Sequence, residues 1–361
     1  MDILVFGAGV LGTLYAQRLQ EAGHRVSLLA RGSRLADLRE HGIVLENGHA
    51  GRWTAVGVNV IDALAPGDAY DLAIVLVRNN QLEGALHALA GNTHIPNVLL
   101  MVNNLSGPEE AVRALGSQRV LLGFPGAGGA RHGHVVRYHI LPGWLQATTL
   151  GELDGRSTAR IRAIARALRG AGFPVETCAD MDAWLKTHAA WVSPVANAIY
   201  MAGGSNYRLA RTRDGLVLMV RAIREGFRVL HARGIPITPA RLRLFEWLPE
   251  PVLVAGWQRV LATPFAETVM AAHANAARDE MGQLAADFRA LAAATGVPTP
   301  TMDRLAAYVD PAVAPAPAGS ARIPMSWHGA WLALAAVGML VLALTLRNRQ
   351  PRARLRQDRA T

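Results

Sequence analysis

The feature that most constrains this chain is a set of three glycines directly after its first apolar run. Residues 3–6 are Ile-Leu-Val-Phe, and Gly7-x-Gly9-x-x-Gly12 follows. In a strand–turn–helix unit that binds dinucleotides, the first glycine permits a tight turn, the second leaves room for the pyrophosphate, and the third lets the helix pack on the strand. The phosphates then meet free N–H groups at the helix N-terminus. We therefore predict a nucleotide site made of Gly7, Ala8, Gly9, Val10, Leu11 and Gly12. The alternative is a glycine-rich turn that binds nothing.

The end of the second predicted strand indicates which dinucleotide is bound. NAD sites usually carry an acidic residue there, which binds the ribose 2′-hydroxyl, whereas a nearby arginine accommodates the 2′-phosphate of NADP. Strand 25–30 runs instead into Arg31-Gly-Ser-Arg34, with no acidic residue before Asp37. The pattern favours NADP(H), with Arg31 at the phosphate. The alternative is that these arginines only solvate a loop.

Two later apolar runs end in polar clusters. Residues 71–77 lead into Arg78, and residues 98–102 lead into Asn103. In a doubly wound sheet, ligands bind outside the carboxyl ends of the strands. These clusters, the glycine loop and the end of the second strand are therefore expected to line one crevice. An α/β domain over residues 1–179 would be completed by strands predicted at 119–124, 135–139, 145–150 and 173–178.

From Asp180 onward the strand signals stop. Asp180 is a predicted N-cap of a helix that Pro194 should kink, and further helices are predicted near 214–233 and 265–296. At 361 residues the chain is long enough for two domains. The sequence thus predicts an all-helical domain over residues 180–308.

One lysine stands out in the composition. The chain has 37 lysine and arginine residues, and Lys186 is its single lysine. Arginine cannot release its proton in a protein, whereas a lysine ammonium can, and burial moves its pKa. A position that keeps lysine in so arginine-rich a chain is a candidate for proton transfer. The alternative is that one surface lysine survived by chance.

Together these features resemble the ketopantoate reductase (2-dehydropantoate 2-reductase) family over about residues 1–308. The motifs that carry the resemblance are the glycine fingerprint, Arg31, Asn103, Thr149-Leu-Gly151-Glu152, Trp184-x-Lys186 and Asp279-Glu280. The resemblance implies a Rossmann domain that binds NADPH, followed by a helical domain of the 6-phosphogluconate dehydrogenase type that closes over it. It also implies reduction of a small 2-keto acid, which in this family is ketopantoate reduced to pantoate in pantothenate biosynthesis.

The resemblance further implies roles for single residues. Lys186 would be the general acid that polarises the keto oxygen and protonates the alkoxide, and Glu280 would hold that lysine and contact the substrate. Asn103 would position the nicotinamide and the substrate, and Arg78 stands where the family commonly has a lysine on the cofactor side. The chemistry agrees, because a developing alkoxide needs a cation or a proton donor beside it.

The substrate side departs from the family pattern. The family usually has asparagine one and two turns after the lysine, where this chain has Ala190 and Pro194. Asn197 lies three residues beyond the second of these positions, and Thr268 is the nearest candidate for the serine that the family has before the late glutamate. His188 and His273 could supply replacement donors, or could be ordinary helix residues. The changes leave two alternatives open. One is an NADP-dependent oxidoreductase of the same family that acts on another keto acid, and the other is a non-catalytic NADPH-binding protein held at a membrane.

Beyond the two domains the composition changes three times. Residues 309–324 read as a Pro/Ala-rich linker, residues 325–346 contain no acidic or basic side chain except His328, and residues 347–361 hold six arginines. An apolar stretch of this length can span a bilayer, and tryptophan near one interface with arginine beyond the other suits such a span. We predict an extra C-terminal transmembrane helix at 325–346 and contact with membrane lipid through 325–361. The alternatives are a helix lying along the membrane face, a docked helix and an oligomer contact.

The remaining composition excludes several classes of partner. The net charge of +10 does not indicate nucleic-acid binding, because the arginine tail alone supplies half of it and no recognised nucleic-acid motif appears. His132 and His134 lack a third ligand nearby, so no metal site is predicted. With Cys178 as the single cysteine, no internal disulfide can form and a reducing compartment is expected. We expect the catalytic domain in the cytoplasm, associated with a membrane through its C-terminal helix, and leave a homodimer open.

Overall fold

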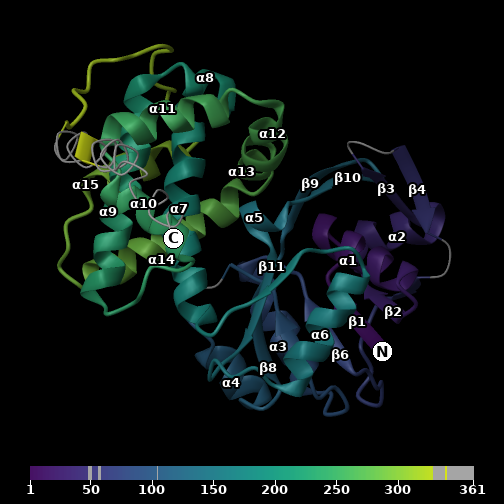
Figure 1. The fold of residues 1–361 in the computed structure, drawn as a ribbon. Coiled ribbons are helices and arrows are strands. Elements are labelled where there is room, and N and C mark those ends of the chain that lie inside the picture. The colour runs from purple at the N-terminus through teal and green to yellow at the C-terminus, as the bar shows by residue number, and fades with distance from the viewer. Residues whose placement is uncertain (48–50, 56–57, 104, 328–337, 340–361) are drawn as a thin grey trace, which may run out of the picture.

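The computed structural model describes residues 1–47, 51–55, 58–103, 105–327 and 338–339. The chain forms an α/β lobe that carries the N-terminus and a helical lobe beside it (Figure 1). The two lobes meet at the start of α7 (Met181–Met201). Met181, Trp184 and Leu185 in its first turns are buried among the side chains of the α/β core, so α7 is anchored in one lobe and continues into the other.

The α/β lobe is built on an eight-stranded sheet in the order β12-β11-β8-β7-β6-β1-β2-β5. Its strands are β1 Asp2–Phe6, β2 Arg25–Leu29, β5 Asn59–Ile61, β6 Leu72–Val75, β7 Val98–Leu100, β8 Val120–Phe124, β11 Thr148–Glu152 and β12 Val175–Thr177. The strands from β8 to β5 run parallel, and β11 is antiparallel to β8. This doubly wound order confirms the predicted Rossmann-like domain.

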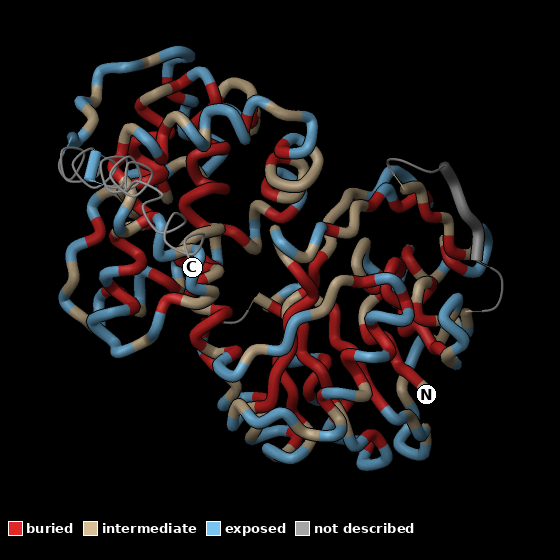
Figure 2. The backbone as a smooth tube through the Cα atoms, viewed as in Figure 1, coloured by how far each residue is buried: buried red, intermediate tan, exposed pale blue. Residues whose placement is uncertain are grey.

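The apolar strands are buried on both faces of the sheet. Side chains alternate along a strand, so Ile3 and Val5 face the core beneath α1 (Val10–Glu21) and α6 (Ala159–Gly170). Leu4 and Phe6 face the opposite core, beneath α3 (Leu82–Ala90) and α4 (Glu109–Leu115). Figure 2 shows these buried strands between helices with exposed outer surfaces. Burial on both faces is the reason the parallel strands read as continuous apolar runs.

A second sheet lies apart from the first, in the order β4-β3-β10-β9. Its strands are β3 Ile43–Asn47, β4 Gly51–Ala55, β9 Ala127–His132 and β10 Val135–Ile140. β10 pairs in parallel with β3, which is distant in sequence. The strand predicted at 145–150 begins later, at Thr148, because the short helix α5 (Gly143–Gln146) follows Pro142.

The helical lobe packs around α7 and α9 (Arg213–Ala232). The other helices are α8 Asn206–Ala210, α10 Leu244–Trp247, α11 Glu250–Leu261, α12 Pro264–Ala266, η3 Glu267–Ala271, α13 Ala272–Ala276, α14 Arg278–Ala293 and α15 Pro300–Ala306. The Asp180 side chain accepts a hydrogen bond from Ala183 N at 2.9 Å, which confirms the predicted N-cap. α7 continues through Pro194.

The predicted helix at 265–296 is divided in the structure. The segment η3 is a π-helical turn, and Ala277 interrupts the helical backbone between α13 and α14 with φ −121° and ψ 35°. Glu280 therefore stands in the first turn of a new helix rather than in the middle of a long one.

The segment after α15 is bound to the helical lobe along its length, which differs from the predicted linker at 309–324. Backbone N–H groups of the segment donate to Met201 O from Ala316 (2.9 Å) and to the Asp214 carboxylate from Ile323 (2.8 Å). Ser326 N donates to Glu250 Oε1 at 2.8 Å. We call residues 309–327 the strap.

In the described part of the chain, no helix is both long enough and apolar enough to cross a membrane. Most of the predicted hydrophobic helix (328–337 and 340–346) and the whole arginine tail (347–361) lie outside the described residues. The transmembrane helix therefore stays a prediction from the sequence.

Candidate active site

The glycine loop between β1 and α1 has two glycines held by the protein and one that faces open space. Gly7 has φ +110°, and a Cβ there would lie 2.5 Å from Leu76 O. A Cβ on Gly12 would lie 1.7 Å from Gly7 O, whereas a Cβ on Gly9 would meet no atom within 4 Å. Gly9 is also the N-cap of α1, without a side-chain cap. The loop therefore offers free space and open N–H groups, which fit a pyrophosphate.

The rest of the predicted fingerprint packs against the protein. Ala8 is buried, and Val10 and Leu11 are partly buried against the core beneath α1. Their side chains thus hold the loop in place, while its open side at Gly9 is backbone. This division agrees with the task assigned to each glycine from the sequence.

The two arginines after β2 have different surroundings. Arg31 is exposed at the N-cap of α2 (Gly32–His41), with its guanidinium carbon 5.6 Å from the centre of the Phe6 ring. Arg34 is buried, and its Nε donates to Ala8 O at 3.0 Å. Burial lowers the pKa of Arg34. Arg34 thus supports the glycine loop, a role that the sequence did not reveal, whereas the side chain of Arg31 is exposed.

The sheet order brings the four predicted strand ends to one edge. β2, β1, β6 and β7 are adjacent and parallel, so the glycine loop, Arg31, Arg78 and Asn103 follow the same edge of the sheet. Across this edge, Asn103 Nδ2 donates to Glu280 Oε1 at 2.7 Å. Arg78 forms an ion pair with Asp279 at 2.8 Å and also donates to Ala276 O at 3.2 Å.

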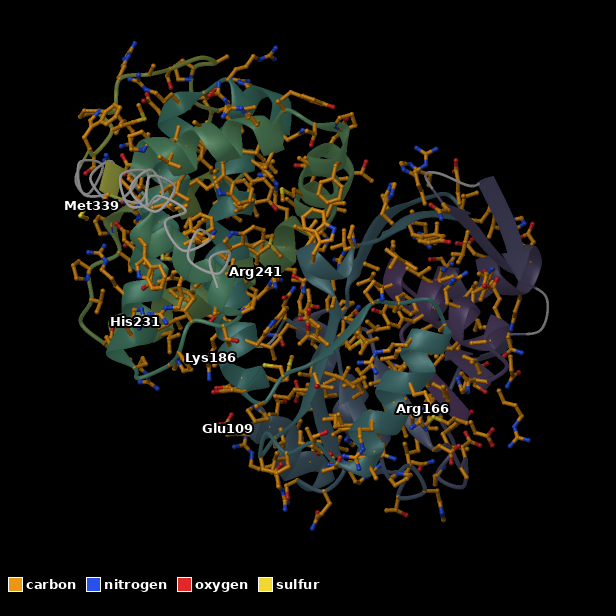
Figure 3. The ribbon with its side chains drawn as sticks, viewed as in Figure 1. Glu109, Arg166, Lys186, His231, Arg241 and Met339 are labelled. Atoms are coloured by element: carbon orange, nitrogen blue, oxygen red, sulfur yellow. The ribbon has the colours of Figure 1, made fainter. Side chains whose placement is uncertain are left out.

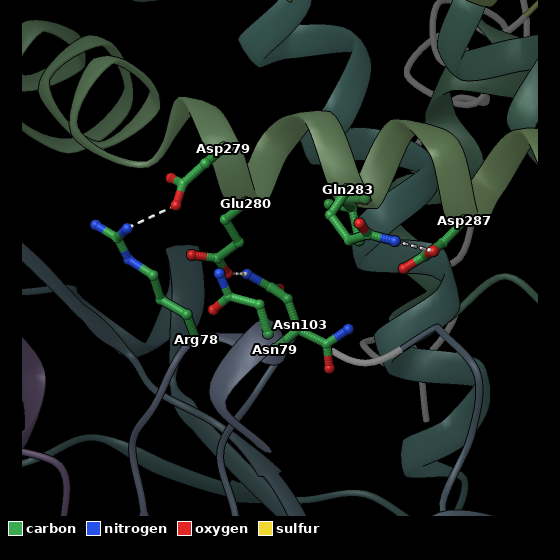
Figure 4. Close-up of a pocket in the computed structure, with 9 residues that line it drawn as sticks. Arg78, Asn79, Asn103, Asp279, Glu280, Gln283 and Asp287 are labelled. Atoms are coloured by element: carbon green, nitrogen blue, oxygen red, sulfur yellow. Dashed lines mark hydrogen bonds and ion pairs between the residues drawn. The ribbon is translucent and has the colours of Figure 1, made fainter. Parts of the chain in front are cut away.

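A cleft of about 250 Å³ lies between the two lobes at this point (Figure 4). The α/β lobe contributes Arg78 and Asn103 from the strand ends, and α14 contributes Glu280 from the other side. Its remaining lining residues are Asn79, Asn80, Asp279, Gln283, Leu284 and Asp287. The sequence had given no role to Asp279, although the adjacent Glu280 and the helix start were signals for it. Carboxylates in a first turn are also favoured by the helix dipole.

Lys186 and Glu280 are not joined in this structure. Lys186 forms an ion pair with Asp182, one turn earlier on α7, and its side chain is 14% exposed. It does not line the cleft, and Glu280 is bonded to Asn103 instead. Ala190, one turn after Lys186, is fully buried, and a Cβ on Gly226 of α9 would lie 3.1 Å from its side chain. Ala190, which stands where the family usually has asparagine, therefore packs α7 against α9.

An aromatic cluster forms where α7 passes the end of β8. The His188 ring lies 4.2 Å from Phe124 and is stacked on Trp184 at 5.3 Å, measured between ring centres. Burial and, to a smaller extent, the neighbouring His273 together lower the pKa of His188 to about 3, so the imidazole is neutral at pH 7. Burial also lowers the pKa of His273, against the opposing effect of Glu280.

The remaining predicted substrate residues have partners elsewhere. Asn197 is buried and lines a separate small cavity with Phe288 and Thr299. The Thr268 hydroxyl donates to Pro264 O at 3.1 Å, within its own helical segment. The structure therefore brings neither side chain to the cleft between the lobes.

Comparison with known proteins adds to this geometry. Residues 3–155 match the family model of ketopantoate reductase PanE/ApbA. A 2-dehydropantoate 2-reductase of Archaeoglobus fulgidus is 30% identical over 200 residues, covering 54% of this chain and 60% of the relative. One of Pyrococcus horikoshii is 22% identical over 255 residues, covering 67% of this chain and 78% of the relative. The matched region thus spans less than two thirds of the Archaeoglobus protein.

Solved structures share the fold over both lobes. A 2-dehydropantoate 2-reductase of Geobacter metallireducens GS-15 has a TM-score of 0.70 at 20% identity, covering 87% of this chain and 100% of its own. D-mandelate dehydrogenase in a ternary structure with NADH and anilino(oxo)acetate has a TM-score of 0.68 at 17% identity, covering 86% and 97%. At such identities the likeness concerns the fold.

Proposed function

We propose that this chain, which belongs to the ketopantoate reductase family, reduces a small 2-keto acid to the 2-hydroxy acid with NADPH, and that ketopantoate is its first candidate substrate. The observation that carries the proposal is the hydrogen bond between Asn103 and Glu280. It joins the carboxyl edge of the dinucleotide sheet to the helical lobe, where a substrate would lie beside the nicotinamide.

The residues of the α/β lobe suit NADPH. The open side of Gly9 and the uncapped N-terminus of α1 would hold the pyrophosphate. The exposed Arg31 would bind the 2′-phosphate, for which an arginine is the usual partner. When bound, the cofactor supplies the hydride. Arg78 forms an exposed ion pair with Asp279 at the cleft. To contact the cofactor, its side chain would leave Asp279 and turn towards the glycine loop.

The residues of the helical lobe would handle the proton. Glu280, fixed by Asn103, would orient the substrate. Lys186 would donate the proton to the alkoxide oxygen, because its ammonium carries three donors and can release one. Since Lys186 is bonded to Asp182, this role requires its flexible side chain to turn from Asp182 towards Glu280.

A different keto acid is the second candidate, favoured by the aromatic cluster. Phe124, Trp184 and His188 place three rings together at the end of β8, and the substrate-side asparagines of the family are replaced by Ala190 and Pro194. A bulkier or aromatic 2-keto acid would suit such surroundings. The structural neighbour D-mandelate dehydrogenase carries anilino(oxo)acetate, a bulky 2-keto acid analogue.

Two further features of the whole chain belong to the proposal. Residues 325–361 would associate the protein with membrane lipid, with the two lobes on the side that holds NADPH. A non-catalytic NADPH-binding protein at the membrane would need no proton donor, so the behaviour of Lys186 separates that alternative from an enzyme. A homodimer remains compatible with both.

The test is NADPH oxidation by the full chain with ketopantoate, beside Lys186→Ala, Lys186→Arg and the exposed control Arg166→Ala on α6. The full chain is needed because truncation before Pro311 would remove the strap. We expect kcat to fall by about 10²–10⁴ in both lysine variants and to stay unchanged in the control. Tight NADPH binding without turnover would direct the search to aromatic keto acids. Activity retained in Lys186→Ala would refute the proton-donor role, and absence of NADPH binding would refute the cofactor.

A further inference from the structure

Four large apolar side chains are exposed on one part of the helical lobe. Leu244 and Trp247 are on α10, with 47% and 66% of their surface exposed, and Val252, on the first turn of α11, is 53% exposed. Trp327, at the end of the strap, is 61% exposed. Glu250 joins the start of α11 to the end of the strap, because it is the first residue of α11 and accepts a hydrogen bond from Ser326 N. We call these four side chains the tryptophan patch.

The border of the tryptophan patch is positively charged. The Arg243 guanidinium lies over the Trp247 ring, 4.8 Å from its centre, and its Nε is 3.7 Å from the Glu246 carboxylate. Arg241 precedes it on the same turn of helix (Figure 3) and keeps its charge while its Nη2 donates to the backbone oxygen of Leu145 at 2.9 Å. The carboxylates nearby are already paired. Glu246 is bonded to His231 at 2.5 Å, and Glu250 is bonded to Arg221.

The chain leaves the described structure at this patch. Arg221 Nη2 donates to Pro324 O at 2.7 Å, which fixes the end of the strap beside α9. After Trp327, the sequence continues for nineteen residues without an acidic or basic side chain except His328, and then enters the six-arginine tail. The long apolar segment at the C-terminal end of the sequence therefore starts beside the tryptophan patch.

We propose that the tryptophan patch lies in the headgroup region of an anionic lipid bilayer, so that the helical lobe rests on the membrane surface; this inference rests on the proposed association of residues 325–361 with lipid. Tryptophan prefers this region because its ring is apolar and its N–H is polar, and arginines near the surface gain from anionic lipid. If the arginine-rich tail of this chain covered the patch instead, its arginines would lie against Arg241 and Arg243 and repel them. If the patch of a second copy of the chain covered it, the two positively charged borders would repel each other. An anionic bilayer attracts both the border and the tail.

The experiment reports on the patch separately from the tail. The full chain with Cys178→Ser and Val252→Cys is labelled with a fluorophore that shifts to the blue in apolar surroundings. A matched protein carries the label at Arg166→Cys, an exposed position on α6 of the other lobe (Figure 3). Each is mixed with vesicles of phosphatidylcholine containing 30% phosphatidylglycerol, and with vesicles of phosphatidylcholine alone.

We expect a blue shift at position 252 with the anionic vesicles, a weaker one with neutral vesicles, and none at position 166. In vesicle cosedimentation, the full chain with Leu244→Ser, Trp247→Ser and Val252→Ser should bind at least about tenfold more weakly. Phe265→Ser, an exposed apolar side chain on α12, should bind as the unmodified chain does.

Three results would overturn the proposal. Vesicle binding without a shift at position 252 would assign the contact to the tail alone. A label that is already blue-shifted without lipid, and independent of protein concentration, would mean that the tail covers the patch. A shift that grows with protein concentration in the absence of lipid would assign the patch to a second copy.

Discussion

The glycine loop and the cleft between the lobes present different chemical groups. The loop presents mainly backbone, through the open face of Gly9 and the N-terminus of α1. The cleft is lined mainly by side chains, with Arg78 and Asn103 from the α/β lobe facing Glu280 and its neighbours on α14. A backbone site depends on where glycines occur along the chain. A side-chain site depends on how separate helices pack, so it can change while the fold stays the same.

The largest effects should come from the glycine loop. Gly12→Ala sets a Cβ 1.7 Å from Gly7 O. Because the backbone fixes the positions of both atoms, we expect a loss of about 3 kcal/mol or more in the free energy of unfolding. Gly9→Ala meets no protein atom, so stability should change by less than about 1 kcal/mol. Its NADPH Kd should nevertheless rise at least about tenfold, or about 1.4 kcal/mol. Urea unfolding without nucleotide and NADPH titration measure the two quantities. Unchanged NADPH binding by Gly9→Ala would place the phosphates elsewhere.

A substitution of Glu280 tests the helical side of the cleft. Glu280→Gln keeps an oxygen for Asn103 but removes the charge, and we expect kcat to fall about 100-fold, about 2.7 kcal/mol in the barrier. NADPH Kd should stay within about twofold. The control is Asp287→Asn, which also lines the cleft but is bonded to Gln283. If the control lost as much activity, the general negative charge of α14 rather than Glu280 would be responsible.

The choice between NADPH and NADH depends on Arg31 in our proposal. Arg31→Ala should reduce the preference for NADPH over NADH by about tenfold or more, since a hydrogen bond to a charged group contributes about 1.5–3 kcal/mol. The ratio of kcat/KM for the two cofactors measures it. Arg34→Ala should instead lower stability, because Arg34 holds Ala8 O from a buried position. An unchanged cofactor ratio in Arg31→Ala would contradict the assignment.

A smaller effect concerns stability at mildly acidic pH. The folded protein keeps His188 neutral down to its pKa of about 3, whereas the unfolded chain takes up the proton near pH 6.5. This contribution to stability is therefore complete above pH 6.5 and declines as the pH falls from 6.5 towards 3. The Tm of the unmodified chain should fall by about 2–4 °C more than that of His188→Phe between pH 7.5 and pH 5. Equal falls would mean that His188 is protonated in the folded state.

Much of the α/β lobe could be predicted from the sequence. Strands such as residues 3–6 are continuous apolar runs because both of their faces are covered, and the glycine spacing marks the turn that follows. The second sheet could not be predicted as a separate unit, because β3 and β10 pair across a long stretch of chain and nothing local encodes that pairing.

The helical lobe shows where local patterns stop being informative. Asp180 was readable as an N-cap because capping is local. The break at Ala277 and the binding of the strap were not, since an alanine-rich helix and a Pro/Ala-rich segment carry no sign of what packs against them. The family resemblance implied that Glu280 holds Lys186, whereas the bond from Asn103 to Glu280 and the pairing of Lys186 with Asp182 emerged only from the structure.

The sequence by itself determined the glycine loop, the parallel sheet behind it, and the order of an α/β unit followed by helices. These depend on short-range patterns of glycine, apolar residues and caps. The tertiary structure alone decided that Arg34 supports the loop while Arg31 is exposed, that Ala190 is packed against α9, and that Asn197 faces another cavity. Those outcomes depend on which side of a helix meets its neighbour, and that is set by the packing of the whole lobe.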